Sequence, residues 1–193
     1  MIMLKEWSER YNVYEDIMNR LKQKGIEFAK GLCDEELCWI EHEYEIAFPE
    51  ELKNFYKEAL PISKGFYNWR DKHSENITNI KRVMNLPVQG IMENFEEIEW
   101  SDAWGEEPSD LTERKKVIVN LAFKAPKLIP IFSHRYMAAV ECEKPPIFSI
   151  HGTDVIYYAK NIVDYFLDEF ITKEHNIFMN HEVSHVSFWS DLL

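Results

Sequence analysis

The chain has 193 residues and a formal net charge of −12, with 34 acidic and 22 basic side chains. This length fits one domain that buries roughly 70% of its unfolded surface, and aromatic residues, 14% of the chain, can build a substantial core. The sequence has no apolar run long enough for a membrane span and no apolar core of a signal peptide, so we expect a cytoplasmic protein that does not contact membranes.

The first 61 residues are predicted to form three helices. Residues 4–24 have an amphipathic helical pattern that ends before Gly25. Asp34 is a suitable N-cap for a second helix. Pro49 stands in the first turn of a third, which Pro61 ends.

The patterns in the middle of the chain are weaker. Residues 63–71 are predicted to be a loop or strand edge, and residues 77–84 a helix. Residues 86–95 are predicted to hold a strand that is interrupted near Gly90. Residues 96–109 have little periodicity, which favours an ordered loop or a short strand.

A helix followed by a strand-rich region is predicted next. Asp110 and Glu113 resemble a capping box at the start of a helix that runs to Phe123. The apolar runs 128–132 and 146–150 are typical of strands.

The strand-rich region closes on a turn, a strand and a helix. Residues 151–154 form the predicted turn, and residues 155–158 a third short strand. Asn161 is the expected cap of the helix that follows, with Ile162 and Phe166 on its buried face.

Four segments of this chain resemble, in the same order, the SUKH superfamily. They are ALPISKGFYNWRD (59–71), LIPIFSHRYM (128–137), PPIFSIHGTDVIYYA (145–159) and DYFLDEF (164–170). That superfamily includes fungal regulators of cell-wall synthesis and bacterial immunity proteins that neutralise polymorphic toxins. The resemblance implies a non-enzymatic α+β binding domain.

The resemblance also implies a division of the chain. Residues 33–170 would form a single SUKH-like domain, with a mostly antiparallel sheet flanked by N-terminal helices and a C-terminal helix. Residues 1–32 would be an N-terminal helical extension, and residues 171–193 a tail packed on the domain.

Acidic residues are concentrated in two segments. Residues 34–51 contain eight acids and residues 93–113 contain nine, and neither segment contains Lys or Arg. Together they carry −17, so the rest of the chain sums to +5. Such a surface repels nucleic acid and favours a basic protein partner, through steering that weakens with salt. Helical spacing explains the acids of the first segment equally well.

The preferred partner surface lies in the second segment, because exposed tryptophans with a charged rim are common in strong protein interfaces. Its residues are Glu96, Glu97, Glu99, Trp100, Asp102, Trp104, Glu106 and Glu107. Trp69 with Arg70, and Arg135 after the first strand, are further candidates for partner binding. Alternatively, Trp69 anchors the core while Arg70 and Arg135 form internal ion pairs.

Catalytic, cofactor and metal sites are not expected. His181, Glu182 and His185 match the zinc motif H-E-x-x-H, but the motif lacks the extended metzincin pattern and a long apolar helix around it. All six glycines are isolated, which excludes a phosphate-binding glycine loop, and no serine stands in a nucleophile elbow.

The three cysteines, Cys33, Cys38 and Cys142, are odd in number and lack metal-ligand spacing, so we expect reduced, mostly buried thiols.

These observations predict an immunity protein that binds and neutralises a cognate toxin, for example a basic nuclease, through an acidic surface. The alternatives are a regulatory protein-binding scaffold and a zinc-dependent hydrolase using the motif at 181–185.

Overall fold

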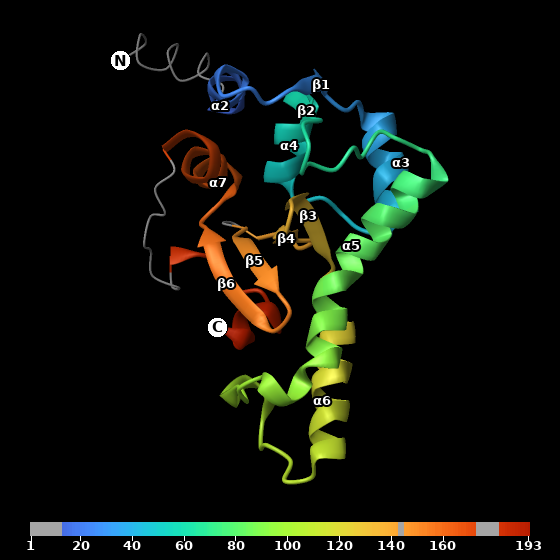
Figure 1. Cartoon of the computed structure of the whole chain (residues 1–193), viewed down its shortest axis with the longest axis vertical. Coiled ribbons are helices and arrows are strands. Elements are labelled where there is room, and N and C mark those ends of the chain that lie inside the picture. Colours follow the sequence, from blue (N-terminus) through green and yellow to red (C-terminus); the bar gives the residue numbers. More distant parts are fainter. Residues whose placement is uncertain (1–12, 143–144, 173–181) are drawn as a thin grey trace.

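A four-stranded antiparallel sheet organises the fold, with its strands in the order β3-β4-β5-β6 (Figure 1). The computed structural model describes residues 13–142, 145–172 and 182–193. The strands of this sheet are β3 (Leu128–Phe132), β4 (Arg135–Ala138), β5 (Ile147–His151) and β6 (Asp154–Ala159). A smaller antiparallel sheet pairs β1 (Phe28–Lys30) with β2 (Ala59–Pro61).

Six α-helices surround the sheets within the described residues, and the whole is one compact α/β domain. They are α2 (Val13–Gln23), α3 (Asp34–Tyr44), α4 (Glu50–Glu58), α5 (Ser74–Glu93), α6 (Leu111–Lys124) and α7 (Ile162–Phe166). Helix α7 continues into a π-helical turn, Leu167–Thr172. Short 3-10 turns occur at Phe95–Glu97, Asp102–Trp104 and Trp189–Leu192. The predicted class of α and antiparallel β elements is thereby confirmed.

The large sheet is buried on both faces. Successive residues of a strand point to opposite faces. Ile129 and Ile147 accordingly belong to one apolar cluster, while their neighbours Leu128 and Phe148 belong to another. The first cluster joins the sheet to α2, α3, α4, α7 and Ile80 of α5, and the second joins it to other residues of α5, to α6 and to the segment 186–189. This two-sided burial explains why the strands read as continuous apolar runs.

Helices α5 and α6 lie side by side and, with the loop that joins them, form an arm that extends beyond the sheet (Figure 1). The predicted strand at 86–95 is wrong, because α5 continues through Pro87 and Gly90 to Glu93. Ile80, Val83, Pro87 and Ile91 are all buried, at spacings of three or four residues. This helical stripe outweighs the low helix preference of proline and glycine.

Two of the three predicted capping residues, Asp110 and Asn161, are confirmed. The third, Asp34, is wrong, because Cys33 holds the N-cap position and Asp34 is the first residue of α3. The Asp110 carboxylate accepts a hydrogen bond from the Glu113 backbone N–H at 2.9 Å, which starts α6. The Asn161 side chain caps α7 in the same way, through the Asp164 N–H at 2.9 Å. Strand β4 was not predicted, although it is hydrogen-bonded to β3 and β5.

The two ends of the described chain pack on the same domain. Ile17, Met18 and Leu21 of α2 are buried in the first apolar cluster, while residues 1–12 of the predicted first helix lie outside the described residues. In the C-terminal segment, Phe188 and Trp189 are buried in the second cluster. None of the described helices has both the length and the apolar character needed to cross a membrane.

The cysteines differ from expectation. Cys33 and Cys38 are exposed and Cys142 is half-buried, and none of the three forms a disulfide within the described chain. The prediction of mostly buried thiols is wrong, because the face of α3 that packs inward carries Leu37, Ile40 and Tyr44 instead.

Candidate functional site

The chain between α5 and α6 displays the second acidic segment. We call residues 93–110 the acidic loop; it lies at the far end of the arm, away from α2 and the small sheet (Figure 1). All its carboxylate side chains are exposed: Glu93, Glu96, Glu97, Glu99, Asp102, Glu106, Glu107 and Asp110. The prediction that this segment forms an ordered loop is confirmed by its 3-10 turns.

Few cations neutralise the acidic loop. Arg114 pairs with Glu107, at 2.7 Å between Nε and Oε1. Within the described part of the chain, Glu96, Glu97 and Glu99 form no ion pair. The loop therefore projects a negative potential into solvent, which attracts cationic partners and falls off with ionic strength.

Trp100 and Trp104 are half-buried and hold the acidic loop to the C-terminal segment. Their rings meet edge to face, with centroids 5.4 Å apart. Trp104 stacks on Phe188, and its Nε1 donates to Asp191 Oδ2 at 3.2 Å. The Trp100 Nε1 donates to the Gly105 carbonyl at 2.8 Å. The two indoles are thus fixed in place, and each keeps part of its surface in contact with solvent.

Arg114 of α6, which the sequence analysis did not single out, holds the acidic loop in place through hydrogen bonds. Arg114 as a whole residue is only 8% exposed. The guanidinium donates to the carbonyl oxygens of Phe95 (2.9 Å) and Ile98 (2.5 Å), and to Glu107. It also lies 5.8 Å from the centre of the Trp100 ring. The one available signal was its position as the first basic residue after the acidic segment.

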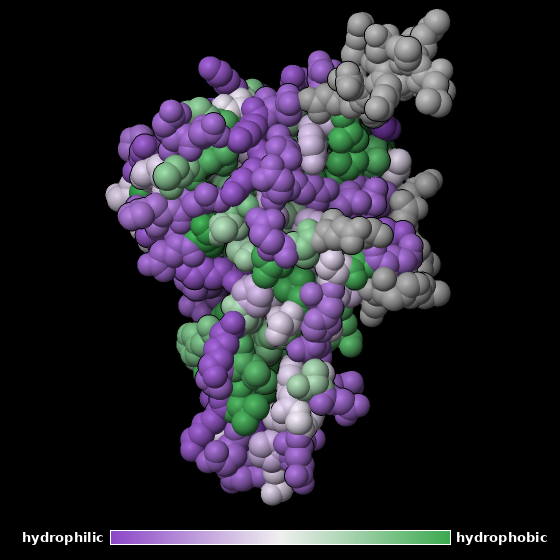
Figure 2. Space-filling model, turned by 180° about the vertical axis from the view of Figure 1, so that it is seen from behind, coloured by the Kyte–Doolittle hydropathy of each residue, from purple (hydrophilic) through white to green (hydrophobic). Residues whose placement is uncertain are grey.

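The arm also exposes apolar area. Figure 2 shows hydrophilic residues over much of the upper part of the molecule and an apolar area over the lower part, where the arm lies. The large apolar side chains that the arm leaves exposed are Leu86, Leu111 and Phe123. Apolar area beside charge is a common composition for a protein interface.

The first acidic segment, residues 34–51, is different because the protein's own lysines and arginine neutralise most of it. The five ion pairs are Asp34–Lys57 (2.8 Å), Glu36–Arg70 (2.5 Å), Glu41–Lys53 (3.0 Å), Glu43–Lys81 (2.6 Å) and Glu45–Lys127 (3.0 Å). The acids of this segment therefore serve the fold, as their helical spacing allowed.

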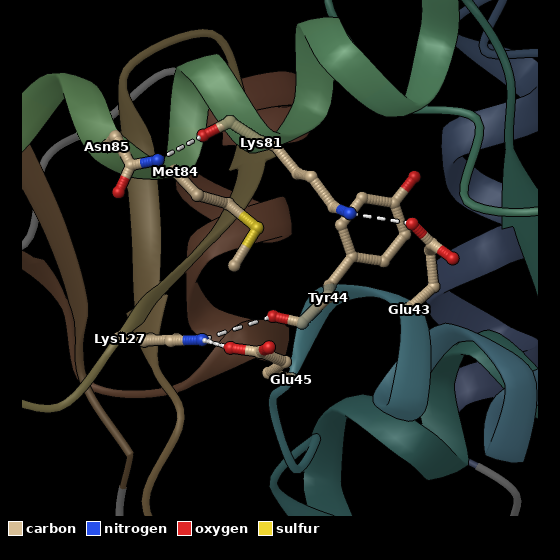
Figure 3. Close-up of a pocket in the computed structure, with 7 residues that line it drawn as sticks. All are labelled: Glu43, Tyr44, Glu45, Lys81, Met84, Asn85 and Lys127. Carbon is tan, nitrogen blue, oxygen red and sulfur yellow. Dashed lines mark hydrogen bonds and ion pairs between the residues drawn. The ribbon is translucent and has the colours of Figure 1, made fainter. Parts of the chain in front are cut away.

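Two of these pairs line a hollow of about 260 Å³ between α3 and α5 (Figure 3). Lys81 of α5 contacts Glu43, and Lys127 contacts both Glu45 and the Tyr44 carbonyl oxygen. The ring of Tyr44 forms a wall, and burial together with nearby carboxylates raises the pKa of its hydroxyl to about 12. Because each cation already has a carboxylate partner, this hollow carries no excess charge.

Trp69 belongs to the interior, and Arg70, which is half-buried, is engaged in an internal ion pair, so we remove both from the candidate surface. Trp69 is fully buried, and its Nε1 donates to the Tyr56 hydroxyl at 3.2 Å. Arg70 forks onto Glu36 and also donates to the Gly31 carbonyl at 2.9 Å. Its guanidinium lowers the pKa of the Glu36 carboxyl to about 2.

Arg135 is also engaged internally. Its guanidinium lies 3.8 Å from the centre of the Tyr158 ring and donates to the Ser149 hydroxyl at 3.0 Å. Glu169 completes the cluster at 3.7 Å. With a side chain only 13% exposed, Arg135 is a structural residue of the sheet, and we remove it from the candidate surface.

Two side chains of the zinc-like motif, those of Glu182 and His185, contact other residues of the protein. Glu182 pairs with Lys160 at 2.6 Å, and His185 Nε2 lies 2.7 Å from Asp191 Oδ1. His181 lies outside the described residues. Among the residues that are described, no three His, Cys, Asp or Glu side chains gather closely enough to hold a metal ion.

Comparisons of the chain with protein-family models, with curated proteins and with solved structures found no match.

Proposed function

We propose that this protein is a SUKH-type immunity protein that acts in the cytoplasm, where its acidic loop binds a basic cognate toxin. The proposal draws on the four motif segments given above and on the geometry of the acidic loop. The arm carries the loop, and contacts with the C-terminal segment hold it against the α/β domain.

The difference between the two acidic segments carries the proposal. In residues 34–51, five carboxylates have cationic partners within the protein. In the acidic loop, only Glu107 has one among the described residues. Leaving like charges clustered and unpaired destabilises a fold through repulsion, so such a cluster is best explained by binding to something outside the molecule.

Against a nuclease, the carboxylates would take the positions of substrate phosphates. A basic active site attracts the acidic loop as it attracts nucleic acid, and the bound loop then blocks the site. Steering of this kind raises association rates by roughly 10- to 1000-fold at low salt. The half-buried tryptophans and the exposed apolar side chains of the arm would add contact area that excludes water.

The partner can be identified by capture on the immobilised protein from a lysate of its source, followed by mass spectrometry. Association rates with that partner are then compared for Glu96→Lys/Glu106→Lys and for Glu27→Lys/Glu141→Lys. Both variants change the net charge by the same amount, and all four glutamates are exposed. Only the first pair lies in the acidic loop.

We expect the loop variant to associate at least tenfold more slowly than wild type at low salt, and the control within about twofold. When each variant is co-expressed with the toxin, the loop variant should protect cells less well than the control variant. Equal rates for the two variants would place the interface on another face. Capture of a non-toxic regulatory protein would instead favour the scaffold alternative.

A further inference from the structure

A second hollow, of about 250 Å³, lies between the acidic loop, the turn that joins β5 to β6, and the C-terminal turn. Its polar lining includes Glu97, Glu99, Ser101, Thr153 and Asp191, and Trp100 contributes its indole. Among the residues that the structure describes, no lysine or arginine lines it. It therefore differs from the hollow of Figure 3, in which every carboxylate has a cation.

Two carboxylates of this hollow, those of Asp191 and Glu97, have hydrogen-bond partners. The Asp191 side chain is only 10% exposed and is bound by His185 and by the Trp104 indole. The Thr153 hydroxyl lies 3.4 Å from Glu97 Oε2, on the side facing the β5–β6 turn. A charged group entering the hollow would meet acceptors that are already oriented, which lowers the entropic cost of binding.

The acidic loop already holds one guanidinium, that of Arg114. Its ligands are a loop carboxylate, two loop carbonyl oxygens and the neighbouring Trp100 ring. Trp100 lines the empty hollow as well. The same segment thus shows, inside the molecule, the combination of acceptors and indole that suits a guanidinium.

We propose that this hollow receives an arginine side chain of the partner protein as the anchor of the complex, an inference that rests on the proposed function. Arginine fits better than lysine because its planar guanidinium can fork onto two carboxylate oxygens and stack on an indole. A cavity of about 150 Å³ accommodates benzene, so the observed volume admits a guanidinium with part of its stem.

The test uses two labelled peptides of equal charge, tetra-arginine and tetra-lysine, and measures the Kd of each by fluorescence anisotropy. Wild type should bind tetra-arginine about tenfold more tightly. Glu97→Gln/Glu99→Gln should bind both peptides equally. Glu96→Gln/Glu106→Gln removes the same charge from the acidic loop outside the hollow, and it should keep the preference for arginine.

The outcomes separate the hollow from the surface around it. An arginine preference that survives in Glu97→Gln/Glu99→Gln would overturn the anchor site and leave the acidic surface intact. If both variants lose the preference for arginine, the preference arises from the overall charge of the acidic loop, and the anchor site is likewise overturned. Wild type that binds neither peptide would overturn this inference and the proposed attraction to basic partners together. Thermal unfolding of each variant checks that it is folded.

Discussion

Arg114 is the residue on which the position of the acidic loop depends most. Arg114→Met keeps a side chain of similar length but removes the charge and every donor. The carbonyls of Phe95 and Ile98 then lose their partner. Each lost bond costs about 1 kcal/mol at the low end, because water can reach a loop. The pair with Glu107, whose side chain is 49% exposed, adds less than about 1 kcal/mol.

The total, about 2–3 kcal/mol, corresponds to a fall in Tm of roughly 4–12 °C for a domain of this size. Differential scanning calorimetry measures it directly. Arg114→Lys retains the charge but cannot fork, so its Tm should lie between those of wild type and Arg114→Met. If both variants melt within about 1 °C of wild type, Arg114 does not hold the loop and the reasoning fails.

Four further predictions concern stability. Gly90→Ala should lower the free energy of unfolding by about 1–3 kcal/mol in urea titrations, because the new Cβ would lie 2.9 Å from the Gly152 Cα. Glu36, with its pKa lowered to about 2, contributes stability that is lost as pH falls from about 5 towards 2, so Glu36→Gln should flatten that decline. Burial raises the pKa of Glu51 to about 7, so the fold loses stability as pH rises from about 4.5 to 7, and Glu51→Gln should abolish that loss. Treatment with EDTA should leave the Tm unchanged, since His185 is engaged by a carboxylate.

Each of these has a result that would contradict it. Alanine is the better helix former by about 1 kcal/mol, so a Gly90→Ala protein more stable than wild type would show that α5 can move away from the turn. Parallel pH profiles for wild type and a glutamine variant would mean that the carboxyl concerned does not titrate as described. A stoichiometric zinc ion lost in His185→Ala would revive the hydrolase alternative.

The sequence was sufficient where structure is determined locally. The caps Asp110 and Asn161 bond within three residues of themselves, and the strands of the β5–β6 hairpin flank a turn with glycine at Gly152. Strand β4 was missed because RYMA is a short central strand with no alternation to mark it. Helix α5 was shortened because Pro87 and Gly90 are ordinarily signs of a break.

The candidate site shows the same limit. The composition of the acidic loop was enough to single it out as the preferred partner surface, but its exposure is known only from the folded structure. The neutralisation of residues 34–51 could not be predicted from the sequence, because partners such as Lys81 and Lys127 are distant in sequence and approach only in the folded chain. The role of Asp191 in holding Trp104 likewise joins positions that only tertiary structure brings together.

The central sheet separates the interior into two compartments, one on each face, and this has a consequence for combined mutations. Leu21 and Ile118 lie in different compartments, so truncating both should cost the sum of the single losses. Met137 and Ile147 are register partners within one compartment, and their double mutant should depart from additivity. Ile118 of α6 can therefore diversify without re-optimising Leu21 across the sheet, whereas α5 is constrained from both sides, because Ile80 lies in the first compartment and Val83 in the second.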